Sequence, residues 1–272
     1  MIFNELIVVR GGGDLATGTI HKLHRCGFRL LVLEVAKPTS IRRKVSFSEA
    51  IYEGSIEIEG IKALHVSDLN EIKKAWNQGE IPVMIDPQGM YIEQLHPKVV
   101  IDGIIAKKNL GTTKGMADIT IALGPGFTAG KDVDVVIETS RGHDLGRLIF
   151  EGEAKKNTGV PGMIKGYSKE RVVYAPYDGP IENRRDIGDI VEKDEIIAYI
   201  GNIPIEAKIH GLLRGIIRNG TEVKAGLKIA DIDPRTSEQS NCYTISDKAR
   251  NIAGGVLEAI LYMKNIKKQD SD

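Results

Sequence analysis

The sequence has few cysteines, no excess of charge and no long apolar run. Its 272 residues include only two cysteines, and 37 basic residues balance 37 acidic ones. A balanced charge argues against binding to nucleic acid or to a membrane surface through bulk electrostatics. No apolar run reaches the roughly 18 residues of a membrane span. We therefore expect no nucleic-acid partner and no membrane partner.

The cysteines and the first residues indicate the cellular location of the protein and whether it binds a metal. Cys26 and Cys242 stand alone, which fits neither a disulfide framework nor a cysteine-based metal site. The chain runs directly into an expected strand and shows no signal-peptide pattern. The sequence thus predicts a cytoplasmic protein without a bound metal.

Glycine, in contrast, is concentrated near the start, in the stretch IVVRGGGDLATGTI at residues 7–20. An apolar strand is expected before the glycines, at 5–9. Apolar residues spaced like one face of a helix follow them, with Asp14 as the predicted N-cap. A second apolar strand is expected at 29–35. The three glycines therefore lie at the strand-to-helix turn of a βαβ unit.

This turn fits the G-x-G-x-x-G/A pattern of dinucleotide-binding folds. In that pattern, glycines leave room for a phosphate, and N–H groups at the start of the helix hold the anion. Glu34 follows Gly13 by 21 residues and stands where an acid binds ribose. The alternative is a glycine-rich turn used only for packing. The expected cofactor-binding residues here are Gly11, Gly12, Gly13, Asp14 and Glu34.

The rest of the first half alternates between expected strands and helices. Strands are predicted at 81–85 and 98–102, a helix at 68–77, and a hairpin around Glu59 and Gly60. Residues 39–54 are also expected to be helical. Their basic run, Arg42 to Lys44, lies either on a solvated face or near phosphates. This alternation predicts an α/β fold with a Rossmann-like, doubly wound parallel sheet.

Glycine-rich loops also follow two later apolar strands, as GPGFTAG at 124–130 and SRGHDLG at 140–146. Ligands of open α/β sheets lie beyond the carboxyl ends of the strands. We therefore expect Gly124, Gly126 and Arg141 to join the cofactor site. His143 is the candidate catalytic base, although a histidine in such a loop is more often structural. No serine triad, Walker lysine or paired metal ligands are present, so whether the chain is an enzyme stays open.

The second half of the chain repeats itself at an offset of 32 between residues 175–200 and 207–232. Two such copies joined by a hairpin resemble the biotinyl/lipoyl hammerhead, a flattened all-β barrel sandwich with approximate two-fold symmetry. The joining hairpin, IGNIP at 200–204, contains no lysine. We therefore expect neither biotin nor lipoate, and a docking or structural role for this domain.

These patterns predict four parts in order. Residues 1–150 form the Rossmann-like nucleotide-binding domain, and 151–171 are a polar, glycine-rich linker. Residues 172–235 form the lysine-less barrel-sandwich domain. Residues 236–272 supply a C-terminal helix, from Ser246 to about Lys264, that packs on the body and ends in a frayed tail.

Five motifs occur along the chain in one order: RGGGDLATG, SFSEAIYEG, LGPGFTAG, VIETSRGHDLGRLI and KIADIDPR. In this combination the chain resembles the YqeB-type accessory proteins of selenium-dependent molybdenum hydroxylases, with distant similarity to XdhC/CoxF-type factors. The resemblance covers nearly the whole chain. It implies a role in maturation, with the hydroxylase as partner.

The resemblance and the glycine pattern meet in one hypothesis. Cofactors of molybdenum hydroxylases can carry a nucleotide through a pyrophosphate, the group that the glycine turn suits. The candidate ligands are NAD(P), FAD and molybdopterin dinucleotide. Two alternatives stay open: an NAD(P)-dependent oxidoreductase acting on a small substrate, and a non-catalytic assembly scaffold.

Overall fold

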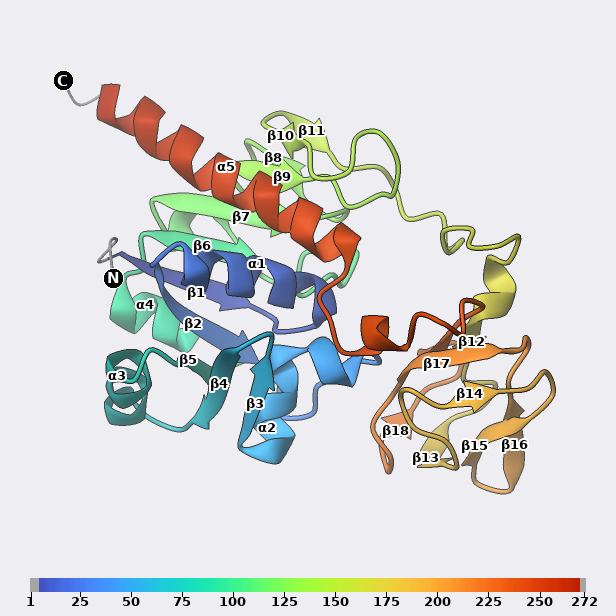
Figure 1. Cartoon of the computed structure of the whole chain (residues 1–272). Coiled ribbons are helices and arrows are strands. Elements are labelled where there is room, and N and C mark those ends of the chain that lie inside the picture. The colour runs from blue at the N-terminus through green and yellow to red at the C-terminus, as the bar shows by residue number, and fades with distance from the viewer. Residues whose placement is uncertain (1–4, 270–272) are drawn as a thin grey trace. The chain divides into compact units, whose positions relative to one another are not determined.

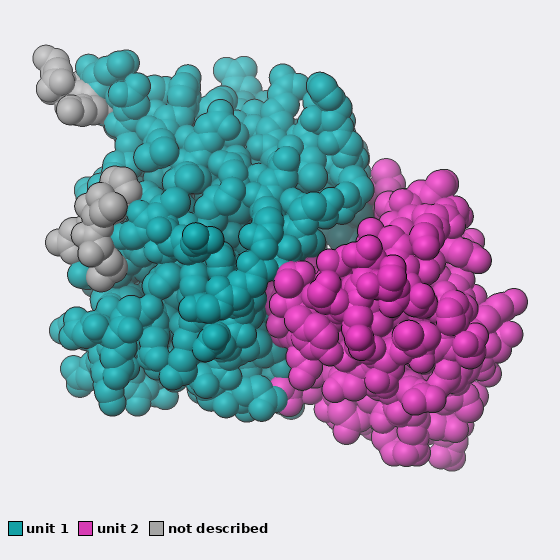
Figure 2. Space-filling model, viewed as in Figure 1, with its two compact units in different colours: residues 1–38, 46–157, 245–272 teal, residues 39–45, 158–244 magenta. Residues whose placement is uncertain are grey.

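The computed structural model describes residues 5–269, which form two compact units (Figures 1 and 2). The first unit contains the chain up to Pro38, Ser46–Asn157, and the chain from Ile245 onward. The second contains Thr39–Val45 and Thr158–Thr244. Each unit has its own buried apolar core. The chain therefore enters the second unit twice, first through a short segment and later through a long one.

A nine-stranded sheet forms the centre of the first unit, in the order β10-β9-β7-β6-β1-β2-β5-β4-β3. Neighbouring strands from β9 to β4 pair in parallel, while β10 and β3 close the two edges antiparallel. The strands are β1 (Leu6–Arg10), β2 (Arg29–Glu34), β3 (Ser55–Ile58), β4 (Ile61–Val66), β5 (Ile81–Ile85), β6 (Val99–Asp102), β7 (Ile119–Leu123), β9 (Val135–Ile137) and β10 (Leu148–Ile149).

Helices cover both faces of this sheet (Figure 1). On one face, α1 (Asp14–Arg25) packs against α5 (Asp247–Gln269) over a core that includes Ile7 and Ile101. On the other, α3 (Leu69–Asn77) and α4 (Met90–Leu95) cover a second cluster of strand residues. Two short strands, β8 (Thr128–Ala129) and β11 (Gly152–Glu153), pair beside the sheet, and η3 (Lys114–Met116) is a single 3-10 turn.

The strands predicted in the first half, the 68–77 helix and the hairpin at Gly60 are confirmed. The C-terminal helix is confirmed as well, and it continues past Lys264 to Gln269. Within residues 5–269 no helix is long and apolar enough to cross a membrane. The predicted frayed tail lies partly outside the described residues.

The helix predicted at 39–54 is wrong for most of its length. The structure has 3-10 turns η1 (Arg43–Val45) and η2 (Phe47–Glu49) and a single helical turn, α2 (Ala50–Glu53). The backbone of Ser48 donates to the Gly12 carbonyl, which pulls the chain out of a helical path.

The two arginines of the basic run are bound within the protein, whereas Lys44 is exposed. Arg42 is 5% exposed and donates to the carbonyls of Asn241 and Thr244, within the second unit. Arg43 donates to the Ile216 carbonyl and to Asp186. Both arginines therefore anchor this segment inside the second unit.

The second unit consists of two four-stranded sheets, in the orders β12-β19-β17-β14 and β16-β15-β13-β18. Residues 172–200, which contain the first repeat, supply β12 (Val172–Tyr174), β13 (Gly179–Asn183), β14 (Ile190–Val191) and β15 (Ile196–Ile200). Residues 203–233, which contain the second repeat, supply β16 (Ile203–Glu206), β17 (Gly211–Ile216), β18 (Glu222–Val223) and β19 (Lys228–Asp233).

The internal repeat is visible in these strands. β13, β14 and β15 begin 32 residues before β17, β18 and β19. Exchanging the strands of the two repeats converts one sheet order into the other. Two 3-10 turns, η4 (Lys169–Arg171) and η5 (Gln239–Cys242), complete the unit. Its second half thus follows the pattern of its first.

Candidate functional site

Charged and polar residues gather where the parallel strands of the large sheet end. Arg10 ends β1, Glu34 ends β2 and Asp102 ends β6. From β1 the chain continues toward β2 and β5, whereas β6 leads to β7 and β9 on the other side. The carboxyl ends of β1 and β6 therefore flank a topological switch point. This is the place where open α/β sheets usually bind ligands.

The glycine turn lies at this switch point and is closely packed. Gly11 has φ +91°, and its N–H donates to the Leu33 carbonyl. A Cβ added at Gly11 would lie 2.9 Å from the Cα of Ile104, and one at Gly12 would lie 2.9 Å from the backbone nitrogen of Ser48. These two glycines therefore make room for the protein's own backbone. The half-buried Gly13 and the first turn of α1 are the part left for a ligand.

Asp14 is not the N-cap that the sequence predicted. The cap is Gly13, which has an extended backbone and no side chain, and Asp14 is the first helical residue. Because glycine has no side chain, the cap residue offers no side-chain oxygen to the N–H groups at the start of α1. Those N–H groups carry the positive end of the helix dipole.

Glu34 is fixed directly beside the glycine turn. One carboxylate oxygen accepts the Gly12 N–H at 2.6 Å, and the other accepts the Val35 N–H at 2.9 Å. Burial raises the pKa of Glu34, although the two N–H groups act in the opposite direction. An ionised carboxylate has about four acceptor sites. Two are used here, so Glu34 retains acceptor capacity for hydroxyl groups such as those of ribose.

A buried hydrogen-bond chain joins the ends of β1 and β6. Arg10 donates to the Thr112 hydroxyl at 2.6 Å, and Thr112 donates to Asp102 at 2.5 Å. Arg10 also donates to the Pro87 carbonyl. Burial raises the pKa of Asp102, while the Thr112 hydroxyl and the charge of Arg10 lower it. This chain fixes the loop between β6 and η3 from both ends.

The predicted glycines of the later loops also lie at this edge. A Cβ at Gly126 would lie 2.6 Å from the backbone of Lys108, and one at Gly124 would lie 2.5 Å from the Thr139 hydroxyl. The loop from Gly103 to Lys108 therefore touches Gly11 at one end and Gly126 at the other. The structure thus places the glycine turn at one end of the 103–108 loop, and the turn at residues 124–126, called the GPG turn, at the other.

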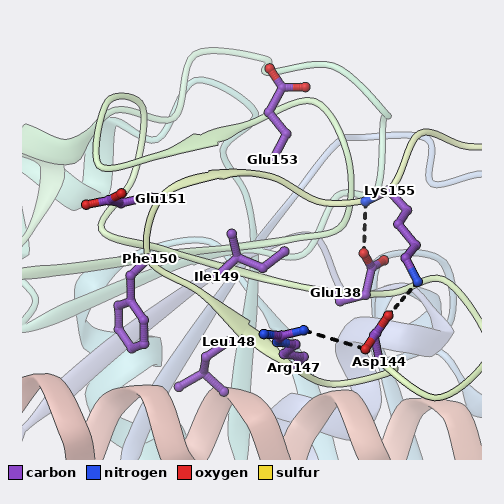
Figure 3. A pocket seen from close by; sticks show the side chains of 9 residues that line it. All are labelled: Glu138, Asp144, Arg147, Leu148, Ile149, Phe150, Glu151, Glu153 and Lys155. Carbon is purple, nitrogen blue, oxygen red and sulfur yellow. Dashed lines mark hydrogen bonds and ion pairs between the residues drawn. The ribbon is translucent and has the colours of Figure 1, made fainter.

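A pocket of about 360 Å³ lies beyond β9 and β10 (Figure 3). Glu138, 3% exposed, lines it and accepts the N–H groups of Ser140 and Lys155. Asp144 pairs with Lys155 at 2.5 Å and lies 3.7 Å from Arg147. The pairing with Lys155 lowers the pKa of Asp144. Both cations of the lining lie against Asp144, and carboxylates outnumber cations around this pocket, because Glu151 and Glu153 line it as well.

Two predicted site residues lie apart from the glycine turn. Arg141 is paired with Asp247 at the start of α5, at 2.8 Å. His143 is exposed in the loop between β9 and β10 and does not line the pocket. Sequence reasoning missed Thr112, whose hydroxyl joins Arg10 to Asp102. Its only signal was a threonine pair that follows the turn Asn109–Gly111.

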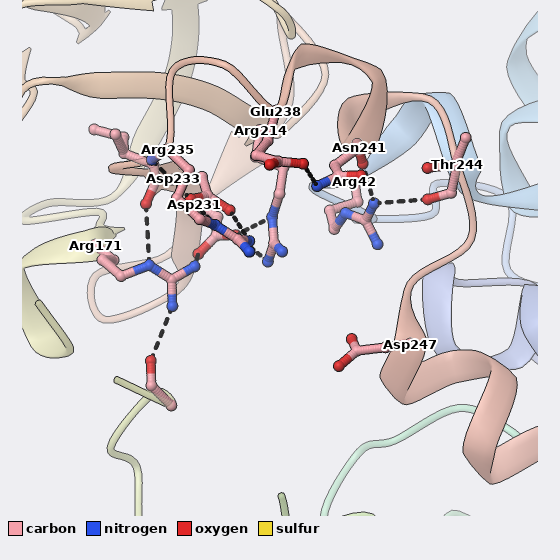
Figure 4. Close-up of polar contacts among 12 residues, drawn as sticks. Arg42, Arg171, Arg214, Asp231, Asp233, Arg235, Glu238, Asn241, Thr244 and Asp247 are labelled. Atoms are coloured by element: carbon pink, nitrogen blue, oxygen red, sulfur yellow. Dashed lines mark hydrogen bonds and ion pairs between the residues drawn. The ribbon is translucent and has the colours of Figure 1, made fainter. Parts of the chain in front are cut away.

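The second unit contains a separate cluster of buried charges (Figure 4). Asp231 accepts a hydrogen bond from Arg214 at 2.8 Å, and Arg171 lies 3.6 Å from it. Arg235 donates to both oxygens of Asp233. Burial alone would raise the pKa of Asp231 and Asp233, but the neighbouring cations hold both below the usual range. The carboxylates of this cluster are therefore paired with arginines of the same unit.

No protein-family model matches the chain. The chain is 46% identical over 260 residues to the uncharacterized protein YqeB of Escherichia coli (strain K12). The chain resembles YqeB. The match covers 96% of this chain and 48% of that protein, so the chain spans about half the length of the curated relative it matches. The YqeB resemblance expected from the motifs is thus confirmed, without any activity attached to it.

Solved structures give only weak likenesses. The apo ectoine utilization protein EutE (DoeB) of Ruegeria pomeroyi is 10% identical, covers 84% of this chain and 85% of its own, and has a TM-score of 0.25. A succinylglutamate desuccinylase from Silicibacter sp. TM1040 is 13% identical, with 84% of each chain covered and a TM-score of 0.25. Likenesses at these scores carry no conclusion about fold or activity.

Proposed function

We propose that the chain binds a nucleotide-bearing molecule at the switch point of the large sheet, between the start of α1 and Glu34. The observation that carries this proposal is the Glu34 carboxylate, held by the Gly12 and Val35 N–H groups beside a helix N-terminus whose cap, Gly13, has no side chain. A ribose diol donates to the free acceptor sites of Glu34. Phosphate oxygens accept from N–H groups in the first turn of α1. The first unit is then a Rossmann-like nucleotide-binding domain.

The biological role that we propose is maturation of a selenium-dependent molybdenum hydroxylase. The pathway is what the five-motif resemblance to YqeB-type accessory proteins implies. The geometry at Glu34 and the start of α1 supports a ligand that carries a diphosphate. Molybdopterin dinucleotide, FAD and NAD(P) all have this chemistry. The chain would hold such a cofactor, without turnover, while the hydroxylase is assembled.

We assign the second unit as a lysine-less barrel-sandwich hammerhead that docks the partner. The support is the 32-residue strand repeat and the exchange symmetry of its two sheets. The hairpin at Gly201 and Asn202 carries no lysine for a prosthetic group. In this arrangement the first unit holds the small molecule and the second holds the protein.

The most direct experiment is mass spectrometry of small molecules released from the natively purified protein. A nucleotide-bearing molecule is the expected result. Thermal shift with FAD, NAD(P)H and cytidine nucleotides then tests affinity, because a true ligand at 100 times its Kd stabilises the fold by about 2.7 kcal/mol. No released molecule and no stabilisation by any nucleotide would favour the pure scaffold instead.

A variant separates ribose recognition from general anion binding. Glu34→Gln removes the charge and replaces one acceptor oxygen by an NH2 donor, which leaves one of the Gly12 and Val35 N–H groups without its acceptor. Nucleotide affinity should fall about tenfold, as for the loss of a hydrogen bond to a charged group. Inorganic pyrophosphate, which has no ribose, should bind the variant at least as tightly as it binds the parent, because a nearby negative charge is removed. Glu93→Gln, on the exposed side of α4, is the matched control. Equal nucleotide affinity in Glu34→Gln and Glu93→Gln would contradict the proposal.

A further inference from the structure

The loop from Gly103 to Thr112 is fixed firmly at both ends. At its start, the Gly103 N–H donates to the Arg10 carbonyl at 2.8 Å, and the Ile104 N–H donates to Asp102 at 3.2 Å. At its end, Thr112 is buried and takes part in the chain from Arg10 to Asp102. The Asn109 side chain closes the last turn by accepting from Thr112 and donating to its carbonyl. Little freedom is left to the residues between these anchors.

The middle of this loop is strained. Ile105 has φ +58° and Lys107 has φ +62°, so two non-glycine residues adopt the left-handed conformation within three positions. For a β-branched residue such as Ile105 this conformation is a genuine outlier. Such conformations persist only where the surrounding structure imposes them, and they cluster at ligand clamps and active sites. The buried anchors of this loop impose it here.

The strained residues also present unused donors. Among residues 5–269, none accepts a hydrogen bond from the backbone N–H groups of Ile105 to Lys108. The side chains of Lys107 and Lys108 are exposed and have no ion pair with a described residue. Nearby cations differ, because Arg141 pairs with Asp247 and Lys155 with Asp144. Successive backbone N–H groups with left-handed residues among them form concave anion sites.

We propose that residues 105–108 form a preorganised diphosphate-binding loop, in which Lys107 and Lys108 neutralise the charge of the ligand. The loop crosses the switch point, because Ile104 packs on Gly11 and Lys108 packs on Gly126. Its ligand is the diphosphate of the nucleotide-bearing molecule, so this inference rests on the proposed function. Glu34 recognises the ribose, and the 105–108 loop binds the diphosphate together with the N–H groups in the first turn of α1.

Close packing explains why the loop works without moving. Gly11 and Gly126 let backbone approach backbone at distances that no other residue permits. The strain is therefore already present before a ligand arrives, and no ordering of the loop is needed at binding. A preorganised site of this kind loses less conformational entropy when the anion binds.

The test measures binding of inorganic pyrophosphate to the full chain by calorimetry. Lys107→Ala/Lys108→Ala should weaken binding about tenfold or more, since hydrogen bonds to charged groups are removed. It should also make the affinity less sensitive to salt. Lys107→Arg/Lys108→Arg keeps both charges and should bind nearly as the parent does. Lys73→Ala/Lys74→Ala, two exposed lysines on α3, is the matched control.

The outcomes separate this inference from the proposed function. If pyrophosphate binds the alanine pair and the α3 control equally well, the diphosphate loop is wrong, whether or not nucleotides bind through Glu34. If pyrophosphate binding depends on Lys107 and Lys108 but no nucleotide binds more tightly than pyrophosphate, the loop is right and the nucleotide proposal fails. If Lys107→Arg/Lys108→Arg binds pyrophosphate as weakly as Lys107→Ala/Lys108→Ala does, positive charge at these positions is not what binds the ligand.

Discussion

The two units hold buried charges in opposite ways. In the second unit, Asp231 and Asp233 lie against arginines, which keep the pKa of both carboxyls low despite their burial. At the edge of the large sheet, Glu34 and Asp102 are held mainly by N–H groups and a hydroxyl. There burial dominates and raises the pKa of both.

This difference separates a structural cluster from a binding edge. In the second unit, Arg171 donates to carbonyls of Gly162 and Ile232 as well as facing Asp231, so its donors are used inside the fold. At the sheet edge, Glu34 keeps free acceptor sites, and the N–H groups of 105–108 have no described acceptor. Residues 106–108 are exposed, so their N–H groups are open to solvent and to a ligand, whereas the donors of Arg171 are not. The proposed function therefore belongs to the sheet edge, and the arginine cluster is expected to contribute stability.

Breaking the arginine cluster should have the largest effect. Asp231→Asn leaves Arg171 and Arg214 without their common carboxylate, and removing one partner of a buried pair costs about 3–5 kcal/mol. The loss should be confined to the second unit. Hydrogen exchange of the β17 and β19 amides measures its opening directly. Trp76, the only tryptophan, reports on the first unit by fluorescence.

The control for this prediction is Asp178→Asn. Asp178 forms an exposed ion pair with Lys224 in the same unit, so its loss should leave hydrogen exchange unchanged. If Asp178→Asn and Asp231→Asn behaved alike, the buried cluster would not be the source of stability.

The next effect concerns the GPG turn. Gly126→Ala places a Cβ 2.6 Å from the Lys108 backbone at φ +107°, so we expect a loss of about 2–3 kcal/mol of unfolding free energy. Gly115→Ala is the control, because nothing lies within 4 Å of the added Cβ and its φ is not positive. Denaturant unfolding followed through Trp76 compares the two. Equal stability of the two variants would show that the loop contact is not tight.

The parts of the fold that depend on local pattern could be predicted from the sequence. Apolar runs gave the strands at β1, β2, β5 and β6, and the repeat at offset 32 gave matching strands in both halves of the second unit. The helix expected at 39–54 failed for a reason outside its own pattern. Arg42 and Arg43 bind carbonyls around 200 residues later in the chain, and no local signal shows this.

The candidate site was predictable in place but not in detail. Strand ends and glycine turns indicated the same edge of the sheet at which we propose the site. The sequence did not show that Gly11 and Gly12 are filled by the backbone of Ile104 and Ser48, because these contacts are long-range. Nor could it show the strained conformation of Ile105, since a β-branched residue disfavours it. Local preference and observed backbone disagree most at the loop that we assign to binding.

The two units should respond to pH with opposite signs. Asp102 has a pKa raised above its ordinary 3.8, so its contribution to stability is present below pH 3.8 and lost as the pH rises through the folded value. Asp233 has a lowered pKa, so its contribution is present above pH 3.8 and lost as the pH falls. The difference in unfolding free energy between parent and variant should change by at most about 1.4 kcal/mol per pH unit.

The measurement compares the parent with Asp102→Asn and Asp233→Asn from pH 3 to pH 7. Relative to the parent, Asp102→Asn should gain stability as the pH rises, and Asp233→Asn should lose it. Only the slopes are compared, because each substitution also removes hydrogen bonds. If the stability difference from the parent changed with pH in the same direction for both variants, the two carboxyls would not have pKa values shifted in opposite directions.

The smallest effect should come from Arg141, which the sequence placed in the cofactor site. Its pair with Asp247 is exposed on both sides, with 54% and 72% of the two side chains accessible. Exposed pairs contribute little, so Arg141→Ala should lower the unfolding free energy by no more than about 0.2–1 kcal/mol. Nucleotide affinity should also stay within about twofold of the parent, because Asp247 already occupies the guanidinium. A large loss of affinity with little loss of stability would instead return Arg141 to the binding edge, and would mean that the ligand displaces Asp247.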